Sequence, residues 1–136
     1  MQRLYDDYLN PNKLEGLSAI ISDDLVNADG SRGAAGFGTV MSRLRGGFPD
    51  LHYTIEELVA EGDRVVARWT LRGTHTGTFR DIAPTGRKIV NNGFAIFRVV
   101  DGRIVESIVE TDRLGFLLAI GRIPYDPVFG PPPRTE

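Results

Sequence analysis

Three polar side chains of this sequence could move or hold a proton on a bound molecule, and Asp112 is the first of them. Asp112 follows Thr111, the last residue of an alternating run, so its carboxylate lies where a predicted strand ends. A carboxyl at such a junction can remove a proton and later return it if partial burial raises its pKa towards neutrality, so that both the ionised and the protonated form are populated. The alternative is structural, because Asp is a favoured N-cap and the segment from Arg113 to Ile120 could be the capped helix.

His75 and Asn27 are the other two candidates, and each has an ordinary structural explanation beside the functional one. His75 lies in a turn rich in glycine and threonine, where it could hold a substrate oxygen or tune a nearby carboxylate. It could equally be a surface turn residue with no role. Asn27 could hydrogen-bond a substrate carbonyl, or bond the backbone of its own loop, and the loop role is favoured.

The composition excludes several classes of chemistry. The 136 residues contain no cysteine and two histidines, which excludes disulfides, thiolate nucleophiles and the usual structural zinc sites, and we expect no metal site. The 16 basic and 18 acidic residues are interspersed, so a nucleic-acid partner is not expected. No apolar run approaches the about 20 residues that a membrane helix needs, and no signal peptide is recognisable. The lack of cysteine fits a cytoplasmic location.

The elements that must position these residues differ between the two halves of the chain. The first half predicts helices, over residues 4–9, 14–21 and 37–44. Asn12 with Glu15 forms a capping-box pattern before the second helix, and the glycine-rich stretch 25–38 is predicted as a loop. The second half predicts strands and a last helical turn, over residues 51–55, 65–71, 89–100, 104–111 and 114–120.

Helices followed by about four long antiparallel strands indicate an α+β domain rather than a parallel fold. Four strands cannot close a barrel, so the helices must cover the inner face of the sheet. A curved sheet would turn that covered face into a cone with a cavity, which is where ligands commonly bind. We place this domain at residues 1–122 and predict a proline-rich tail over residues 123–136.

The turn Asp101-Gly102 predicts which side chains face the cavity, because a two-residue hairpin fixes the register of its strands. The predicted pocket face, which mixes apolar side chains with small hydroxyls, carries Asn92, Phe94, Ile96, Val105, Ser107, Val109 and Thr111. The predicted outer face, which could pair with a second subunit, carries Ala95, Phe97, Val99, Ile104, Glu106, Ile108 and Glu110. A slip of one residue would exchange the two faces.

Several segments in a fixed order resemble a known family. They are Gly47-Phe48-Pro49-Asp50-Leu51, Val59-Ala60-Glu61-Gly62-Asp63, Gly73-Thr74-His75-Thr76-Gly77, Pro84-Thr85-Gly86 and Asp101-Gly102-Arg103-Ile104-Val105-Glu106. Over residues 3–121 the chain resembles the SnoaL-like polyketide cyclases of the NTF2-like superfamily. The resemblance implies a cone-shaped α+β fold with a hydrophobic pocket, commonly a homodimer. It also implies ring closure by an intramolecular aldol step without metal or cofactor.

The resemblance retains Asp112 as the acid that precedes the final Leu-Gly. We therefore predict Asp112 as the acid and base, with His75 as a second catalytic residue that orients the substrate together with Asn27. The residues predicted to line the pocket are Phe48, Trp69, Phe94, Ser107 and Val109. The chain departs from the family where His-Trp-Asp is common and this sequence has Ser107, Ile108 and Val109, and again at Ala28, where a histidine is common.

Two classes of function follow from these observations. The leading hypothesis is a cofactor-independent enzyme of the cyclase or isomerase type, acting on a polyketide or another cyclic hydrophobic molecule. The alternative is a non-catalytic binding or dimerisation module, which the apolar Val109 and the uncharged Ser107 favour. A polyketide hydroxylase or a relative of epoxide hydrolases is a third possibility, because one fold supports several chemistries.

Overall fold

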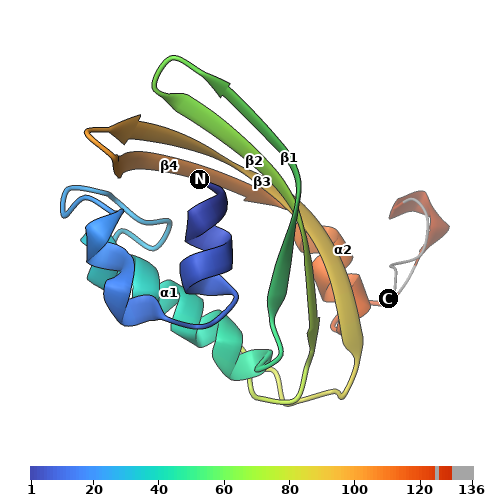
Figure 1. Cartoon of the computed structure of the whole chain (residues 1–136). Coiled ribbons are helices and arrows are strands. Elements are labelled where there is room, and N and C mark those ends of the chain that lie inside the picture. Colours follow the sequence, from blue (N-terminus) through green and yellow to red (C-terminus); the bar gives the residue numbers. More distant parts are fainter. Residues whose placement is uncertain (125, 130–136) are drawn as a thin grey trace.

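A curved antiparallel sheet forms the body of the protein in the computed structural model, which describes residues 1–124 and 126–129 (Figure 1). Its strands are hydrogen-bonded in the order β1-β2-β3-β4. They are β1 (His52–Glu61), β2 (Arg64–Thr74), β3 (Lys88–Val100) and β4 (Arg103–Thr111). Each strand therefore pairs with its neighbour in sequence, as expected for consecutive hairpins. The predicted α+β class is confirmed.

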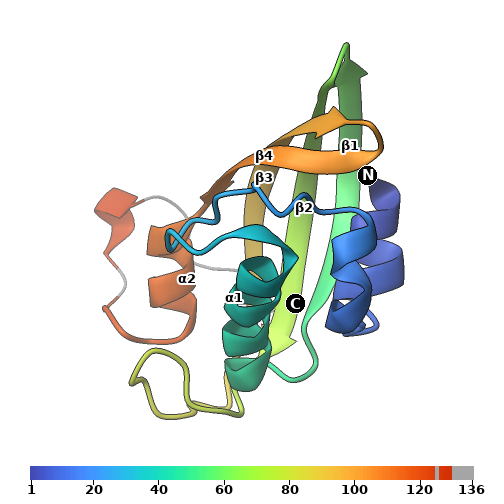
Figure 2. The same cartoon turned by 90° about the vertical axis from the view of Figure 1, so that its left-hand side faces the viewer.

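The helices cover the concave face of this sheet. They are the π-helix η1 (Leu4–Leu9), the 3-10 helix η2 (Leu14–Ala19), α1 (Gly33–Gly47) and α2 (Arg113–Ala119). A last 3-10 turn, η3 (Pro127–Phe129), lies apart from that face (Figure 1). Figure 2, which looks onto the concave side, shows α1 between α2 and the two N-terminal helices. None of the helices in the described ranges is long and apolar enough to cross a membrane. The domain boundary at residue 122 stays a prediction, and residues 125 and 130–136 of the predicted tail lie outside the described residues.

Two predictions about the helices are wrong. Asn12 does not cap η2, because it adopts a positive φ of 59° and the N-cap is Lys13, with no side-chain hydrogen bond. The third helix begins at Gly33 rather than at Phe37. A Cβ on Gly33 would lie 3.2 Å from the backbone of Asp23, so this glycine permits close packing of the preceding loop. Tertiary contact therefore overrides the weak helix propensity of the glycine-rich stretch.

The β3–β4 hairpin begins as predicted and then shifts its register. Asp101 and Gly102 have φ values of 52° and 77°, the left-handed pair that a type I′ turn requires. Beyond the turn Val99 pairs with Ile104, but Arg98 pairs with Glu106, so Val105 is an extra residue in a β-bulge. The bulge moves every later residue of β4 by one position relative to β3.

This bulge corrects the predicted facing of β3. Ser107 pairs with Phe97, Val109 with Ala95 and Thr111 with Gly93, so these residues share the concave face. The prediction was right for the three residues of β4 and wrong for their partners on β3. On β3, Ala95 and Phe97 were expected outside and are buried, whereas Asn92, Phe94 and Ile96 lie on the convex face. Ile104 of β4, which precedes the bulge, was also expected outside and is buried. A single inserted residue reverses the facing because side chains alternate along a strand.

Polar side chains attach the N-terminal helices to the sheet. The Asn10 amide pairs with the backbone of Tyr53 as a strand would, donating to the carbonyl at 2.9 Å and accepting from the N–H at 2.7 Å. The Arg45 guanidinium donates to the carbonyls of Leu9 at 2.7 Å and Leu51 at 3.2 Å. These bonds satisfy backbone groups that the end of η1 and the start of β1 would otherwise leave unpaired.

Candidate functional site

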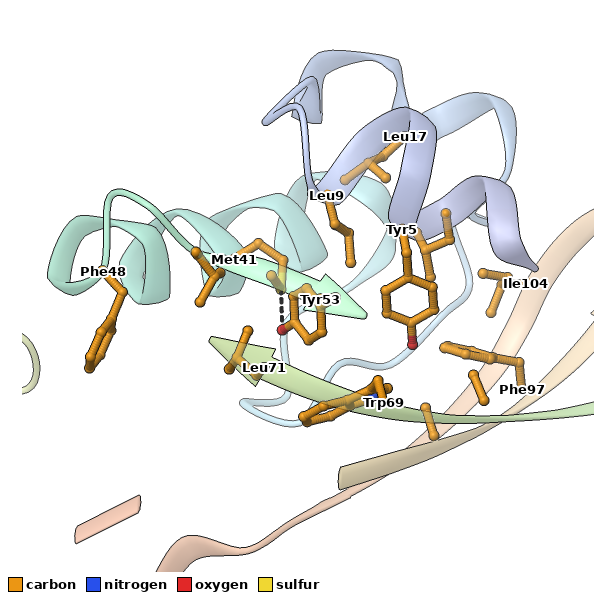
Figure 3. Packing of buried hydrophobic residues seen from close by; sticks show 14 of the residues in the cluster. Tyr5, Leu9, Leu17, Met41, Phe48, Tyr53, Trp69, Leu71, Phe97 and Ile104 are labelled. Carbon is orange, nitrogen blue, oxygen red and sulfur yellow. Dashed lines mark hydrogen bonds between the residues drawn. The ribbon is translucent and has the colours of Figure 1, made fainter. Parts of the chain in front are cut away.

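Aromatic side chains fill the middle of the concave face (Figure 3). The Tyr53 ring meets Trp69 edge to face at 5.1 Å between centroids and lies 5.4 Å from Tyr5. Trp69 is 3% exposed. Burial raises the pKa of both tyrosine phenols well above the ordinary value, so they stay protonated at neutral pH. Trp69, predicted to line the pocket, is therefore part of the core.

A second aromatic cluster closes the end of the cone next to α2. Phe48 is fully buried and meets Phe79 at 5.8 Å and Phe116 at 5.6 Å, while Phe79 and Phe116 are 5.7 Å apart. All three contacts are edge to face, the geometry that aromatic quadrupoles favour. Phe48 was predicted to touch a ligand, but these rings enclose it. Phe48 is therefore a core residue, with no part of its side chain exposed to solvent or to a ligand.

His75 belongs to this second cluster. Its ring stacks on Phe48 with centroids 5.1 Å apart, and its Nδ1 lies 3.0 Å from the Thr85 Oγ1. The side chain is 0% exposed, and in the described part of the chain its Nε2 has no hydrogen-bond partner. Burial leaves the ring no surface to offer to a substrate, which contradicts the predicted contact of His75 with one.

Asp112 lies at the end of β4, where sequence analysis placed it. The residue is exposed, and its Oδ1 accepts a hydrogen bond from the Gly115 N–H at 2.8 Å. It is therefore the N-cap of α2. Its own N–H donates to the Asn92 carbonyl at 3.0 Å, which fixes it to the first half of β3. The capping role does not remove the carboxylate from solvent, so the carboxylate remains accessible to a bound molecule.

Beside Asp112, part of the concave face is open. Ala95 of β3 is buried, but its cross-strand partner Val109 is 43% exposed, because the helices stop short of the edge strand. Ser107 and Thr111, the neighbours of Val109 on the same face, are half-buried. We call Ser107, Val109 and Thr111 the open strip. It offers two hydroxyls around an apolar side chain, and Asp112 directly follows its last residue.

Two predicted site residues lie away from this strip. Phe94 is 40% exposed on the convex face, between Arg68 of β2 and Glu110 of β4. Its predicted position in the pocket is wrong, because the bulge shifts the register of β4 relative to β3. Asn27 donates from Nδ2 to the carbonyls of Ser31 and Gly33 at 3.1 and 3.2 Å, which ties its own loop together. Its amide is occupied by this loop rather than directed to a ligand.

Ser107 and Val109 thus share the concave face and Asp112 follows the same strand, whereas the other predicted residues lie elsewhere. Thr111 joins the strip as well: sequence analysis placed it on the pocket face, by its alternation with Ser107 and Val109, but did not name it as a site residue. A groove of about 500 Å³ lies elsewhere, between Leu14 of η2 and Ala34 of α1. Among residues 1–124 and 126–129, no group of three His, Asp or Glu side chains could hold a metal ion.

Comparison with known proteins identifies the family. The model of the SnoaL-like polyketide cyclases matches residues 1–120. The chain therefore belongs to the SnoaL-like polyketide cyclase family, and the predicted resemblance is confirmed. A comparison with curated protein sequences finds no match.

Solved structures agree with this assignment. IdmH of Streptomyces antibioticus, named as a candidate polyketide cyclase, is 31% identical, with a TM-score of 0.75 over 88% of this chain and 94% of its own. AclR of Streptomyces galilaeus, named as a candidate hydroxylase, is 30% identical, with a TM-score of 0.75 over 87% of this chain and 76% of its own. A SnoaL-like protein from Jannaschia, at 24% identity and a TM-score of 0.79, covers 90% of both chains and supports the fold alone.

Proposed function

We propose that this protein binds a cyclic, hydrophobic molecule of the polyketide type on the open strip, and that Asp112 catalyses an acid/base reaction on it without a cofactor. The observation that carries the proposal is the position of Asp112, an exposed carboxylate at the end of a partly exposed strip of the concave face. Membership of the SnoaL-like family and the names of its relatives support the substrate class.

The reaction that suits this arrangement is an intramolecular aldol step. The Asp112 carboxylate removes a proton from a carbon next to a carbonyl, and the resulting enolate carbon attacks a second carbonyl of the same molecule. A carbon–carbon bond forms, the second carbonyl becomes an alkoxide, and the proton on Asp112 returns to that alkoxide. The Ser107 and Thr111 hydroxyls can donate hydrogen bonds to the oxygen on which charge develops.

The test separates the capping role of Asp112 from its chemistry. Asn is as good an N-cap as Asp but cannot accept a proton, so Asp112→Asn should keep α2 while losing catalysis. The assay is deuterium uptake from heavy water into the acidic methylene of an aryl β-keto ester, followed by mass spectrometry. We expect a rate loss of about a hundredfold or more in Asp112→Asn. Glu110→Gln, which changes a carboxylate on the convex face, is the matched control, and unchanged exchange in a folded Asp112→Asn protein would refute the assignment.

A second function, binding without catalysis, is favoured by the uncharged side chains of the open strip itself. Ser107 and Val109 are uncharged where the resemblance to the family implies ionisable residues, and Asp112 already serves as a helix cap. In that case a tricyclic ligand such as emodin would quench or shift the fluorescence of Trp69, the single tryptophan, without any deuterium exchange. A hydroxylase activity is a further variant, and the relative AclR motivates it. Consumption of molecular oxygen with the same ligand would distinguish it.

We also propose that the protein is a homodimer located in the cytoplasm. The convex face carries a cross-strand apolar row of Val59, Val66, Ile96 and Ile108, in which Val59 is 58% and Ile108 53% exposed. Covering such a row is a common reason for association. Light scattering should give twice the chain mass for the native protein and a smaller mass for Ile108→Lys. A native monomer would exclude the dimer, and cell fractionation tests the cytoplasmic location, which the cysteine-free composition supports.

A further inference from the structure

His75 carries a polar atom that the fold leaves without a partner. Within residues 1–124 and 126–129, Nε2 of His75 is the buried side-chain nitrogen or oxygen with no hydrogen bond. The opposite nitrogen, Nδ1, lies 3.0 Å from the Thr85 Oγ1. Buried polar groups are almost always paired, so an exception of this kind calls for an explanation.

The two sides of the ring decide which nitrogen carries the proton. A proton on Nε2 would leave a buried donor with no acceptor, and orphaned N–H groups are rarer in proteins than orphaned acceptors. With the proton on Nδ1, the ring donates to the Thr85 Oγ1, and Nε2 is left as a bare acceptor. Among the described residues His75 has no ion pair, and a buried charge without one would be costly, so the ring is uncharged.

The backbone on both sides holds the ring in place. The His75 N–H donates to the Arg87 carbonyl at 2.9 Å, and the His75 carbonyl accepts from the Gly86 N–H at 2.8 Å. The next residue, Thr76, donates from its N–H to the carbonyl of Gly47, the last residue of α1, at 3.2 Å. His75 therefore connects the start of β3, the loop 75–87 and the end of α1.

A continuous set of contacts leads from this ring to the proposed catalytic carboxylate. His75 stacks on Phe48, and Phe48 meets Phe116 of α2. Phe116 donates its N–H to the carbonyl of Asp112 at 3.0 Å. The ring of His75 is thus two aromatic contacts and one hydrogen bond away from the residue that caps α2.

We propose that His75 is a positioning residue for Asp112, held as the uncharged Nδ1–H tautomer by Thr85 and acting through Phe48 and Phe116. It is not a catalytic residue, since it touches neither solvent nor the open strip. The proposal rests on the proposed function of Asp112 for its consequence in catalysis. The positioning itself is measurable without any substrate.

The tautomer can be read directly by long-range proton–nitrogen correlation NMR on the whole protein. We expect a pyrrole-type signal for Nδ1 and a pyridine-type signal for Nε2. The reverse assignment, or an imidazolium signal at neutral pH, would overturn the proposal. This measurement does not depend on activity, so it stands even if Asp112 has no catalytic role.

Variants of Thr85 test the positioning without disturbing the core, because Thr85 itself is exposed. Thr85→Val removes the hydroxyl at nearly constant shape, and Thr85→Ser keeps it. The readout is the amide of Gly115, whose N–H reports the position of the Asp112 carboxylate. We expect hydrogen exchange at Gly115 to accelerate roughly fivefold in Thr85→Val, the factor that one net hydrogen bond represents, and not in Thr85→Ser. Equal exchange in the two variants would refute the positioning role.

Substitution of His75 itself provides a second pair. Asn places its amide nitrogen where Nδ1 lies and can keep the bond to Thr85, whereas Gln places its amide nitrogen where Nε2 lies and cannot. We expect the hydrogen-exchange rate of the Gly115 amide to stay closer to that of the native protein in His75→Asn than in His75→Gln. The opposite order would contradict the assigned tautomer. If these variants shift Gly115 as expected but Asp112→Asn still catalyses exchange, the positioning holds and the proposed function of Asp112 fails.

Discussion

Gly93 of β3 provides a sharp test of the packing described above. Its position on the concave face lies directly under the Trp69 indole. A Cβ added to Gly93 would lie 2.4 Å from the Trp69 Cη2 and 2.7 Å from the backbone oxygen of Glu110. The indole could rotate only by displacing Tyr5 and Tyr53, and the Glu110 carbonyl is fixed in the sheet. Gly93→Ala must therefore push β3 and β4 apart or move Trp69 from its rotamer.

The expected cost follows from the size of this overlap. An added methyl group in a packed core usually destabilises a protein by 1–3 kcal/mol, so we expect about 2 kcal/mol for Gly93→Ala. For a chain of this length that corresponds to a fall in melting temperature of roughly 6 °C. The same substitution in a strand without neighbours would be favourable, since glycine loses more backbone entropy on folding than alanine.

The assay is urea unfolding followed by circular dichroism and by the fluorescence of Trp69. Gly46→Ala is the matched control, because Gly46 lies in α1 with nothing within 4 Å of an added Cβ. There we expect a gain of up to about 1 kcal/mol from helix propensity. If Gly93→Ala were as stable as the native protein, the close approach of Trp69 to the sheet would be wrong. A shift in tryptophan emission is the second expected sign of strain.

Three further outcomes are expected from the same structure. Asn10→Ala should lose about 1–3 kcal/mol in urea unfolding, because it removes both hydrogen bonds to the Tyr53 backbone; Asn10→Asp, which keeps the acceptor, should lose less. Phe97→Ala leaves a cavity in the core and should lower the free energy of unfolding by about 3–5 kcal/mol. A smaller loss would mean that the surrounding side chains move in to fill the cavity. Burial raises the pKa of Asp50, but the Thr74 N–H and hydroxyl outweigh burial and lower it. Stability from Asp50 is therefore present above the unfolded pKa and lost as pH falls below about 4, and Asp50→Asn should flatten this acid limb in thermal unfolding.

The sequence alone determined the class of the fold. The periods of the helices and strands, the Asp101-Gly102 turn and the α2 segment are local properties, and local patterns record them directly. The order of the motifs also indicated the family, and the position of Asp112 at the end of β4 followed from the end of an alternating run. An N-cap and a catalytic acid both need such a position, so the sequence could not separate the two roles.

Only the tertiary structure decided which residues meet. The bulge at Val105 has no signal in the sequence, and it alone reverses the facing of Phe94 relative to Val109. The enclosure of His75 by Phe48 and the loop 75–87 depends on contacts between segments distant in sequence. The exposure of Val109 depends on where the helices stop short of β4. Burial and register are properties of the whole packed domain, and for that reason the sequence determined the residues that could do chemistry while packing decided where each of them lies.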